Sequence, residues 1–300
     1  MSASAPTPPF GAATGPVLEV VGLKKTFLLS GFPARRRSVL DDVSFSLGAG
    51  EIVALVGESG SGKSTLARIV ARLERADAGA LKLEGADVFR TEPRHASLAY
   101  RARVQMVFQD PFASLNPAHR VRHHLARPLL VHGRARPADV DARVVELLES
   151  VGLHPGADFA DRYPHALSGG QRQRVAVARA LAAGPKVIIA DEPTSMLDAS
   201  TRVGVLDLLR RLTRERGITI LLITHDLATA RHLADRVVVL AGARVVEQGA
   251  TAAVFETPTH PYTRQLLEAS RAARAAAPGL PAGDAAVQWI PGRRDPVSDR

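Results

Sequence analysis

Three apolar runs, separated by longer stretches with helical spacing, dominate the middle of the chain. The runs cover residues 51–56, 186–190 and 218–224, and their residues are almost continuously apolar. Runs of this length and character are typical of parallel strands that are buried on both faces. Apolar residues with helical spacing lie between them, at 64–73, 140–151, 172–183 and 201–216. This alternation predicts an α/β fold with a doubly wound, mainly parallel sheet.

Other segments show the pattern of antiparallel strands. Apolar residues alternate with serines over residues 43–47, which predicts a strand with one buried face. Residues 17–21 form a further candidate strand, and residues 236–240 with 244–247 predict a late hairpin. Between the first two strands, residues 28–38 carry three consecutive arginines. We expect a solvated loop there, with a contact to lipid headgroups or a partner as the alternative.

The two ends of the chain differ in composition from the part between them. Residues 1–16 have neither a basic start nor an apolar core, so we expect a disordered leader and not a secretory signal. Alanine, proline, glycine and charged residues prevail from residue 277, and we expect 269–300 to be a mostly flexible extension. No apolar stretch approaches the ~18 residues that a membrane-spanning helix needs.

Composition narrows the possible chemistry. The 300 residues include no cysteine, which excludes a disulfide scaffold, a thiolate metal site and a cysteine nucleophile. Aromatic residues make up 4%, too few to suggest a surface built for stacking nucleic-acid bases. The formal net charge of +9 permits nucleic acid, anionic lipid or nucleotide phosphate as partners. The arginines are spread along the chain, so a merely basic surface explains the charge equally well.

A glycine-rich loop follows the first apolar run. It fits the pattern G-x-x-x-x-G-K-[ST] and lies between a predicted strand and a predicted helix, which is the context of a phosphate-binding loop. Its residues are Gly57, Glu58, Ser59, Gly60, Ser61, Gly62, Lys63 and Ser64. Glycines allow successive backbone N–H groups and the helix N-terminus to point at phosphate oxygens. We expect Lys63 to reach the β- and γ-phosphates and Ser64 to ligate Mg²⁺.

Titratable side chains stand at the ends of the other two runs. Asp191 and Glu192 follow the second run, and His225 follows the third. The carboxyl ends of parallel strands meet at the edge where open α/β sheets bind ligands. We expect Asp191 to hold Mg²⁺ through water and Glu192 to polarise the attacking water as general base. His225 can donate a hydrogen bond to the γ-phosphate and stabilise charge in the transition state.

A second glycine-rich turn lies before the second run. Residues 167–171 read LSGGQ and open a helix, another place where an anion can bind. With the other motifs in this order, the chain resembles the ATP-binding subunits of ABC transporters, whose signature is this LSGGQ. The resemblance covers residues 17–268. It implies a P-loop NTPase-type ABC ATPase domain with a mainly parallel core sheet, a small antiparallel β subdomain and a helical subdomain at about 110–175.

The resemblance also implies how ATP is held. In this family two ATP-binding domains pair head to tail, and ATP lies between them. The loop that begins at Gly57, extended by Thr65, would hold ATP and its Mg²⁺ from one side. The signature of the facing chain would contact the γ-phosphate from the other side, so hydrolysis requires a dimer. The signature residues are Ser168, Gly169, Gly170 and Gln171.

Three more residues receive roles by likeness to the family. Gln109 matches the glutamine that ligates Mg²⁺ and senses the transporter subunit. Asp198 belongs to the segment that links the two sites across the dimer, where Met196 replaces the usual alanine. Phe27 stands where the family places an aromatic ring that stacks on adenine. A phenylalanine packed into the core is the alternative interpretation of Phe27.

Three further stretches resemble the dipeptide, oligopeptide and nickel importers of the family. They are residues 106–117, 163–166 and 258–264. This likeness implies integral membrane permease subunits as partners, together with a second ATP-binding subunit, either a copy or a paralogue. An extracytoplasmic solute-binding protein would join through the complex, and this chain would lie on the cytoplasmic side of the membrane.

The cargo stays open at this level. Many peptide importers carry a cysteine-rich stretch near the C-terminus, and this chain has no cysteine, which excludes an iron–sulfur site. Di- or oligopeptides are the favoured cargo, and nickel or another small solute is the alternative. A soluble nucleic-acid-associated ABC ATPase is the alternative of a different class. Such proteins usually have fused ATP domains or coiled-coil inserts, which this chain lacks, so we expect no direct contact with nucleic acid.

Overall fold

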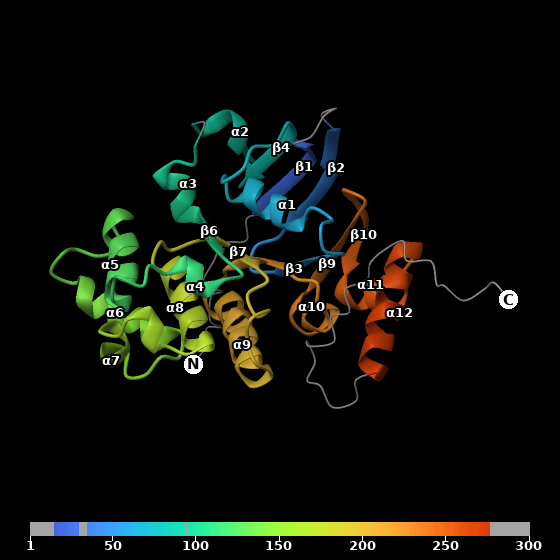
Figure 1. The fold of residues 1–300 in the computed structure, drawn as a ribbon. Helices are drawn as coiled ribbons and strands as arrows, with labels where there is room; N and C mark the ends of the chain where they lie inside the picture. The colour runs from blue at the N-terminus through green and yellow to red at the C-terminus, as the bar shows by residue number, and fades with distance from the viewer. Residues whose placement is uncertain (1–14, 30–34, 94, 277–300) are drawn as a thin grey trace, which may run out of the picture.

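The protein is built around a six-stranded sheet, seen in a computed structural model that describes residues 15–29, 35–93 and 95–276 (Figure 1). Five neighbouring strands of this sheet run parallel to one another. The sixth, β10, pairs antiparallel with β9. In order across the sheet, the strands are β10 (Arg244–Ala250), β9 (Arg236–Ala241), β3 (Ile52–Val56), β8 (Thr219–Ile223), β7 (Val187–Asp191) and β6 (Val104–Val107). The predicted mainly parallel α/β sheet is confirmed.

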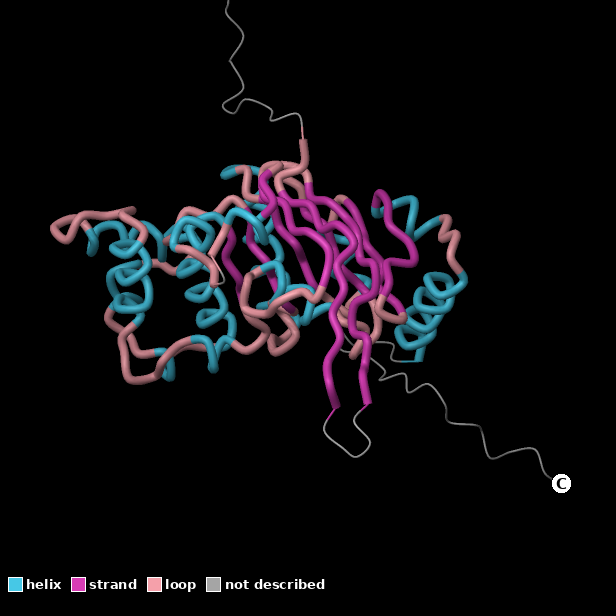
Figure 2. Tube along the Cα trace, turned by 90° about the horizontal axis from the view of Figure 1, so that it is seen from above, coloured by secondary structure: helices cyan, strands magenta, loops and turns pink. Residues whose placement is uncertain are grey.

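A second, antiparallel sheet of four strands lies beside the first. Its order is β2 (Arg35–Leu47), β1 (Leu18–Leu29), β4 (Ala78–Leu83) and β5 (Ala86–Asp87). The strands β1 and β2 extend beyond the rest of the sheet as a long hairpin (Figure 2). The antiparallel β subdomain implied by the family resemblance is therefore present.

The loop expected at residues 28–38 is wrong at both of its ends. Strand β1 continues to Leu29, and β2 begins at Arg35, with Leu28 paired with Arg36 and Phe27 paired with Arg37. Residues 30–34 lie outside the described residues. The side chains of Leu28, Arg36 and Arg37 are exposed. A projecting hairpin has no buried face, so its strands lack the apolar alternation on which the sequence-based prediction depended.

Alternate residues of the parallel strands belong to two separate cores. In β3, Val53 and Leu55 pack with α1 (Lys63–Val70) and with the four-stranded sheet. Ile52, Ala54 and Val56 pack on the opposite face, in the core that contains most of the helices. Successive side chains of a strand point to opposite faces, so a continuous apolar run serves both cores at once.

Helices cover the two faces of the six-stranded sheet unequally. Short helices α2 (Val88–Thr91) and α3 (Leu98–Arg103) join α1 on the first face. The second face is covered by α8 (Gly169–Leu181), α9 (Ala199–Arg216), α10 (Leu227–Leu233), α11 (Thr251–Glu256) and α12 (Pro261–Ala276). No helix in the described part of the chain is long and apolar enough to cross a membrane.

The segment between β6 and β7 contains no strand in the structure. It contains α4 (Pro111–Ser114), α5 (Val121–Val131), α6 (Val140–Ser150), α7 (Gly156–Ala160), the 3-10 turn Pro164–Ala166 and α8. Helices α5 to α7 lie to one side of the six-stranded sheet, with α8 between them and the sheet (Figure 1). This arrangement corresponds to the helical subdomain that the family resemblance implies at about residues 110–175.

The boundary expected at residue 268 lies inside helix α12, which continues to Ala276. Leu267 is buried in the second core and fastens the helix to the sheet. The residues that follow it are rich in alanine, the best helix former, which favours continuation of the helix. Residues 269–276 of the expected, mostly flexible extension are thus helical, and residues 277–300 lie outside the described part.

We predict that Leu221→Ala in β8 destabilises the protein by about 2–5 kcal/mol, because it leaves a cavity in a fully buried position. Urea unfolding followed by circular dichroism measures the change in the free energy of unfolding. Val203→Ala, at an exposed position of α9, is the control and should change stability by less than about 0.5 kcal/mol. Equal losses in the two variants would contradict the assignment of Leu221 to the core.

Candidate active site

The residues predicted for phosphate chemistry meet at one edge of the six-stranded sheet. Strands β3, β7 and β8 are parallel neighbours, and they end at Val56, Asp191 and Ile223. The glycine-rich loop leaves β3 at this edge, Glu192 leaves β7, and His225 leaves β8 within two residues. The topology therefore unites groups that lie far apart in the sequence.

The glycine-rich loop has a backbone that only glycine can adopt at its two ends. Gly57 has φ +152°, and a Cβ atom there would lie 2.2 Å from the carbonyl oxygen of Leu240. Gly62 has φ +109°, and its Cβ would lie 2.5 Å from the carbonyl oxygen of Val39. Gly62 is the N-cap of α1 and supplies no side-chain hydrogen bond to the first turn. The unpaired N–H groups of that turn are therefore available to an anion.

Lys63 holds its ammonium group inside the loop. Its Nζ donates hydrogen bonds to the carbonyl oxygens of Gly57 at 2.8 Å and of Glu58 at 2.6 Å. Burial lowers the pKa of Lys63, and the carboxylates of Glu192 and Asp191 oppose that shift. A buried lysine at the start of a helix, next to the N–H groups of its first turn, forms a binding site for a phosphate group.

Asp191 has the features of a ligand for a divalent cation. Its Oδ1 atom is buried and has no hydrogen-bond partner among the described residues. Its side chain is hydrogen-bonded to Ser64, and burial together with the neighbouring Glu192 raises its pKa. A buried carboxylate beside a hydroxyl group matches the oxygen ligands that Mg²⁺ prefers. The residues present therefore fit a magnesium ion.

Glu192 turns away from Asp191 although the two residues are adjacent. Its φ of +44° lies in the left-handed region, which is rare for a residue with a side chain. Its N–H donates to the carbonyl oxygen of Ile223 at 2.9 Å, and this bond ties the turn that follows β7 to the end of β8. Such strain occurs where the surrounding structure imposes it, often at functional sites. The turn gives the two carboxylates separate environments.

Glu192 forms contacts with two side chains that follow other strands of the sheet, His225 and Gln109. Its Oε1 lies 2.9 Å from Nδ1 of His225, and its Oε2 accepts a hydrogen bond at 3.0 Å from Nε2 of Gln109, which follows β6. The hydrogen bond from His225 lowers the pKa of Glu192. The same bond raises the pKa of His225 above 6.5. With Nδ1 bonded to Glu192, Nε2 of His225 is a second donor when the imidazole is protonated, the form that the raised pKa favours.

The signature turn is organised as a helix cap. Ser168 Oγ accepts from the N–H of Gln171, and the Gln171 side chain accepts from the N–H of Ser168, which forms a capping box at the start of α8. A Cβ at Gly170 would lie 1.8 Å from Thr201 Cγ2, so glycine permits the close contact between α8 and α9. No hydrogen bond or ion pair in the described part of the chain joins the signature residues, including Gly169, to the glycine-rich loop.

Asp198 and Met196 lie just before α9. Asp198 is the N-cap of α9, and its carboxylate accepts hydrogen bonds from Thr201 N and Ser200 Oγ. The backbone bond from Thr201, with those from the two hydroxyl groups, lowers the pKa of Asp198 to about 2. Met196 is 55% exposed and therefore lies at the surface.

Phe27 lies on the β1–β2 hairpin, with its ring at the surface. The residue is 36% exposed, and the Nζ atom of Lys25 stands 4.9 Å from the centre of its ring. The alternative of a phenylalanine packed into the core is therefore wrong. Its stacking on adenine stays a prediction.

Tyr262, on α12, contacts the glycine-rich loop, a contact that the sequence analysis did not include. Its Oη accepts a hydrogen bond from the N–H of Glu58 at 3.2 Å. The two residues are 204 positions apart in the sequence. No local pattern links them, and the only sequence signal was the family-like stretch at residues 258–264.

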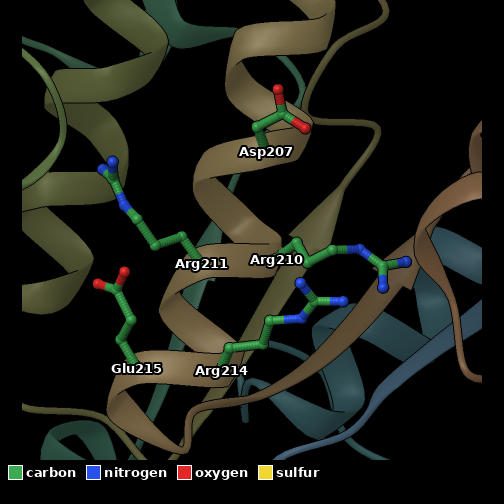
Figure 3. A pocket seen from close by; sticks show the side chains of 5 residues that line it. All are labelled: Asp207, Arg210, Arg211, Arg214 and Glu215. Carbon is green, nitrogen blue, oxygen red and sulfur yellow. The ribbon is translucent and has the colours of Figure 1, made fainter.

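A hollow on α9 lies away from this site. Figure 3 shows the charged side chains around it: Asp207, Arg210, Arg211, Arg214 and Glu215. Helix α9 ends near the start of β8, and hence at the amino edge of the parallel strands. Arg210 donates to the carbonyl oxygen of Leu233, and Arg211 to that of Ser150, so both arginines join α9 to neighbouring elements.

Comparison with known proteins identifies the class. Residues 40–195 match the family described as ABC transporter. A dipeptide transport ATP-binding protein of Haemophilus influenzae is 42% identical over 85% of this chain and 78% of its own length. An oligopeptide transport ATP-binding protein of Streptococcus mutans is 43% identical over 84% of this chain and 81% of its own length.

Solved structures agree with this result. A dimeric ATP-binding cassette in a post-hydrolysis state, bound to ADP and inorganic phosphate, has a TM-score of 0.69 at 30% identity and covers 78% of this chain and 98% of its own. The protein cbiO1 of Clostridium perfringens, part of an ABC transporter complex, has a TM-score of 0.69 at 28% identity over 81% of this chain and 91% of its own.

The chain belongs to the ABC transporter family, as one of its ATP-binding subunits. It is a nucleotide-binding ATPase with the fold of that family, so the resemblance and the fold class drawn from the sequence are confirmed.

We predict that the pKa of His225 lies above 6.5 and falls in Glu192→Gln, because the neutral amide no longer favours the protonated imidazole. The stabilisation from protonated His225 is then present below pH 6.5 and lost as the pH rises through the raised pKa. NMR titration of the imidazole Hε1 signal measures the value. Glu215→Gln on α9 is the control, and a His225 pKa that is equal in both variants would refute the pairing.

Proposed function

We propose that this chain hydrolyses ATP, with Mg²⁺, to energise an importer of di- or oligopeptides. The observation that carries the proposal is the meeting of Gln109, Glu192 and His225 at the sheet edge that also holds Lys63. That set contains groups to bind phosphates, to orient water and to stabilise charge. Relatives named for dipeptide and oligopeptide transport support the peptide cargo.

The residues of the loop bind the nucleotide. The backbone N–H groups from Gly60 to Thr65 surround the phosphates, and Lys63 neutralises the β- and γ-phosphate charge. Ser64, Asp191 and Gln109 would hold Mg²⁺, and the bound ion would neutralise charge on the phosphate oxygens. Phe27 stacks on the adenine.

Glu192 and His225 act on the transferred group. The lowered pKa of Glu192 keeps its carboxylate ionised at neutral pH, so it accepts a hydrogen bond from the attacking water and orients it. A carboxylate of this kind is a weak proton acceptor, so positioning is the larger part of its role. His225 is held by Glu192 through Nδ1 and, in its protonated form, donates from Nε2 to the γ-phosphate.

The site is completed by a second ATP-binding subunit, a copy or a paralogue, in a head-to-tail dimer. The exposed signature turn at Ser168 faces the nucleotide of the partner, and Asp198 lies at the dimer seam. The dimeric cassette of similar fold supports this assembly. Because a ligand shifts only equilibria between states that it binds differently, ATP binds the closed dimer more tightly than the open one.

The complex includes permease subunits in the membrane and an extracytoplasmic solute-binding protein. The chain itself lies at the cytoplasmic face of the membrane as a peripheral subunit. A groove for single-stranded nucleic acid would need aromatic side chains for stacking, and the chain is poor in them. Nucleic acid is therefore not among the proposed partners.

We predict that Glu192→Gln lowers the ATP hydrolysis rate by ~10²-fold or more while ATP binding is retained, because the amide does not act as the water-orienting carboxylate. Phosphate release measures turnover, and displacement of a fluorescent nucleotide measures binding. Glu215→Gln, an exposed glutamate on α9, is the matched control. Normal hydrolysis by Glu192→Gln would overturn its catalytic role.

We predict that cells lacking this chain lose uptake of a labelled di- or tripeptide, and that wild-type chain restores it. Lys63→Ala should not restore it, because the loop then lacks the cation that binds phosphate. Labelled nickel is measured in parallel. Unchanged peptide uptake with lost nickel uptake would replace the peptide cargo with nickel, and unchanged uptake of both would exclude both cargoes.

A further inference from the structure

The hydrogen bond between Tyr262 and the glycine-rich loop acts on a particular peptide group. The N–H of Glu58, which donates to Tyr262 Oη at 3.2 Å, belongs to the same peptide group as the carbonyl of Gly57. That carbonyl accepts the hydrogen bond from Lys63 Nζ at 2.8 Å. In a trans peptide the N–H and C=O point in opposite directions. The peptide group is thus held on one side by a tyrosine and on the other by the phosphate-binding lysine.

The position of Tyr262 is itself fixed by β10. The Glu247 carboxylate accepts hydrogen bonds from Thr259 N at 2.7 Å, from Thr259 Oγ1 at 2.9 Å and from His260 N at 3.1 Å. Tyr262 N donates to His260 Nδ1 at 3.2 Å. These bonds hold the turn that begins α12, so the tyrosine reaches the loop from a rigid support.

The environment of Tyr262 keeps its hydroxyl group intact. The ring packs against the second core and is half-buried. Burial raises the pKa of Tyr262 to about 12. The phenol is therefore protonated throughout the physiological range, and its bond to the loop does not depend on pH.

We propose that Tyr262 is a positioning residue for ATP binding: its hydroxyl orients the Gly57–Glu58 peptide group and, through it, the ammonium of Lys63. The inference rests on the nucleotide site of the proposed function and adds α12 to it. Hydrogen bonds in series polarise one another, so a bond at the N–H strengthens the acceptor at the carbonyl. Loss of the hydroxyl leaves Lys63 less well ordered before ATP arrives.

The test is Tyr262→Phe in the full chain, because it removes the hydroxyl and keeps the ring. We expect the Kd and KM for ATP to rise by about 2- to 10-fold, the range that one net hydrogen bond supplies. The value of kcat at saturating ATP should stay within about twofold of wild type, because bound ATP itself orders Lys63 and the chemical groups are untouched. ATP titration and steady-state phosphate release give the three constants.

Tyr100→Phe is the matched control. Tyr100 is buried and its hydroxyl donates to the carbonyl oxygen of Val70 at 2.5 Å, at the far end of α1 from the loop. This variant loses a hydroxyl bonded to a backbone group of the same domain. We expect a lower midpoint of thermal unfolding and an unchanged Kd for ATP.

A second variant tests the support of Tyr262. Glu247→Gln keeps the shape of the side chain and weakens its three hydrogen bonds, so it should weaken ATP binding in the same direction. Two substitutions that disrupt the same contact have effects on the free energy that do not add. The double variant Glu247→Gln with Tyr262→Phe should therefore bind ATP no more weakly than Tyr262→Phe alone.

Wild-type ATP affinity in Tyr262→Phe would overturn the proposal, as would equal losses of affinity in Tyr262→Phe and Tyr100→Phe. Lys63→Ala, measured in the same titration, separates this failure from a failure of the site. If Lys63→Ala no longer binds ATP while Tyr262→Phe binds it normally, the nucleotide site is correct and the proposed role of Tyr262 is wrong. If Lys63→Ala binds ATP normally, the nucleotide site itself is wrong.

Discussion

Burial of the central parallel strands on both faces is the constraint on which the rest of this structure depends. The side chains of β3, β7 and β8 are all buried, and they alternate between two cores. A strand packed on both sides cannot slip by one residue without sending its side chains to the wrong cores. The points at which the strands end are therefore fixed, and the residues that follow them meet at a fixed edge.

That edge concentrates charge that the fold alone does not neutralise. Burial lowers the pKa of Lys63 and raises that of Asp191, so both groups are disfavoured in their charged forms. A phosphate group with its divalent cation would supply the missing partners, a negative charge for the lysine and a positive charge for the aspartate. Glu192 and His225 differ, because their mutual contact lowers the pKa of Glu192 and raises that of His225, which favours the charged form of each. The site thus combines two groups whose charges a bound ligand would balance, Lys63 and Asp191, with two groups that are already held in position by each other, Glu192 and His225.

The predictions from the sequence agree best with the structure where consecutive residues form the functional element. The loop from Gly57 to Ser64 and the strand before Asp191 were predicted from local patterns, because a phosphate-binding loop and a buried strand are local structures. The β1–β2 hairpin and the end of α12 were not. The projecting part of the hairpin has no apolar alternation to produce a pattern, and α12 continues beyond residue 268 through alanine-rich residues whose helix propensity favours it.

The sequence by itself determined the class of the protein, the buried parallel strands at its centre with the helices between them, and the chemical groups that follow those strands. Only the tertiary structure decided which of those groups touch. It joined Glu192 to Gln109 and His225, and it brought Tyr262 to the loop from 204 residues away. The reason is physical: residue type and spacing are properties of the chain, whereas a hydrogen bond between distant residues requires the packing that places them within about 3 Å.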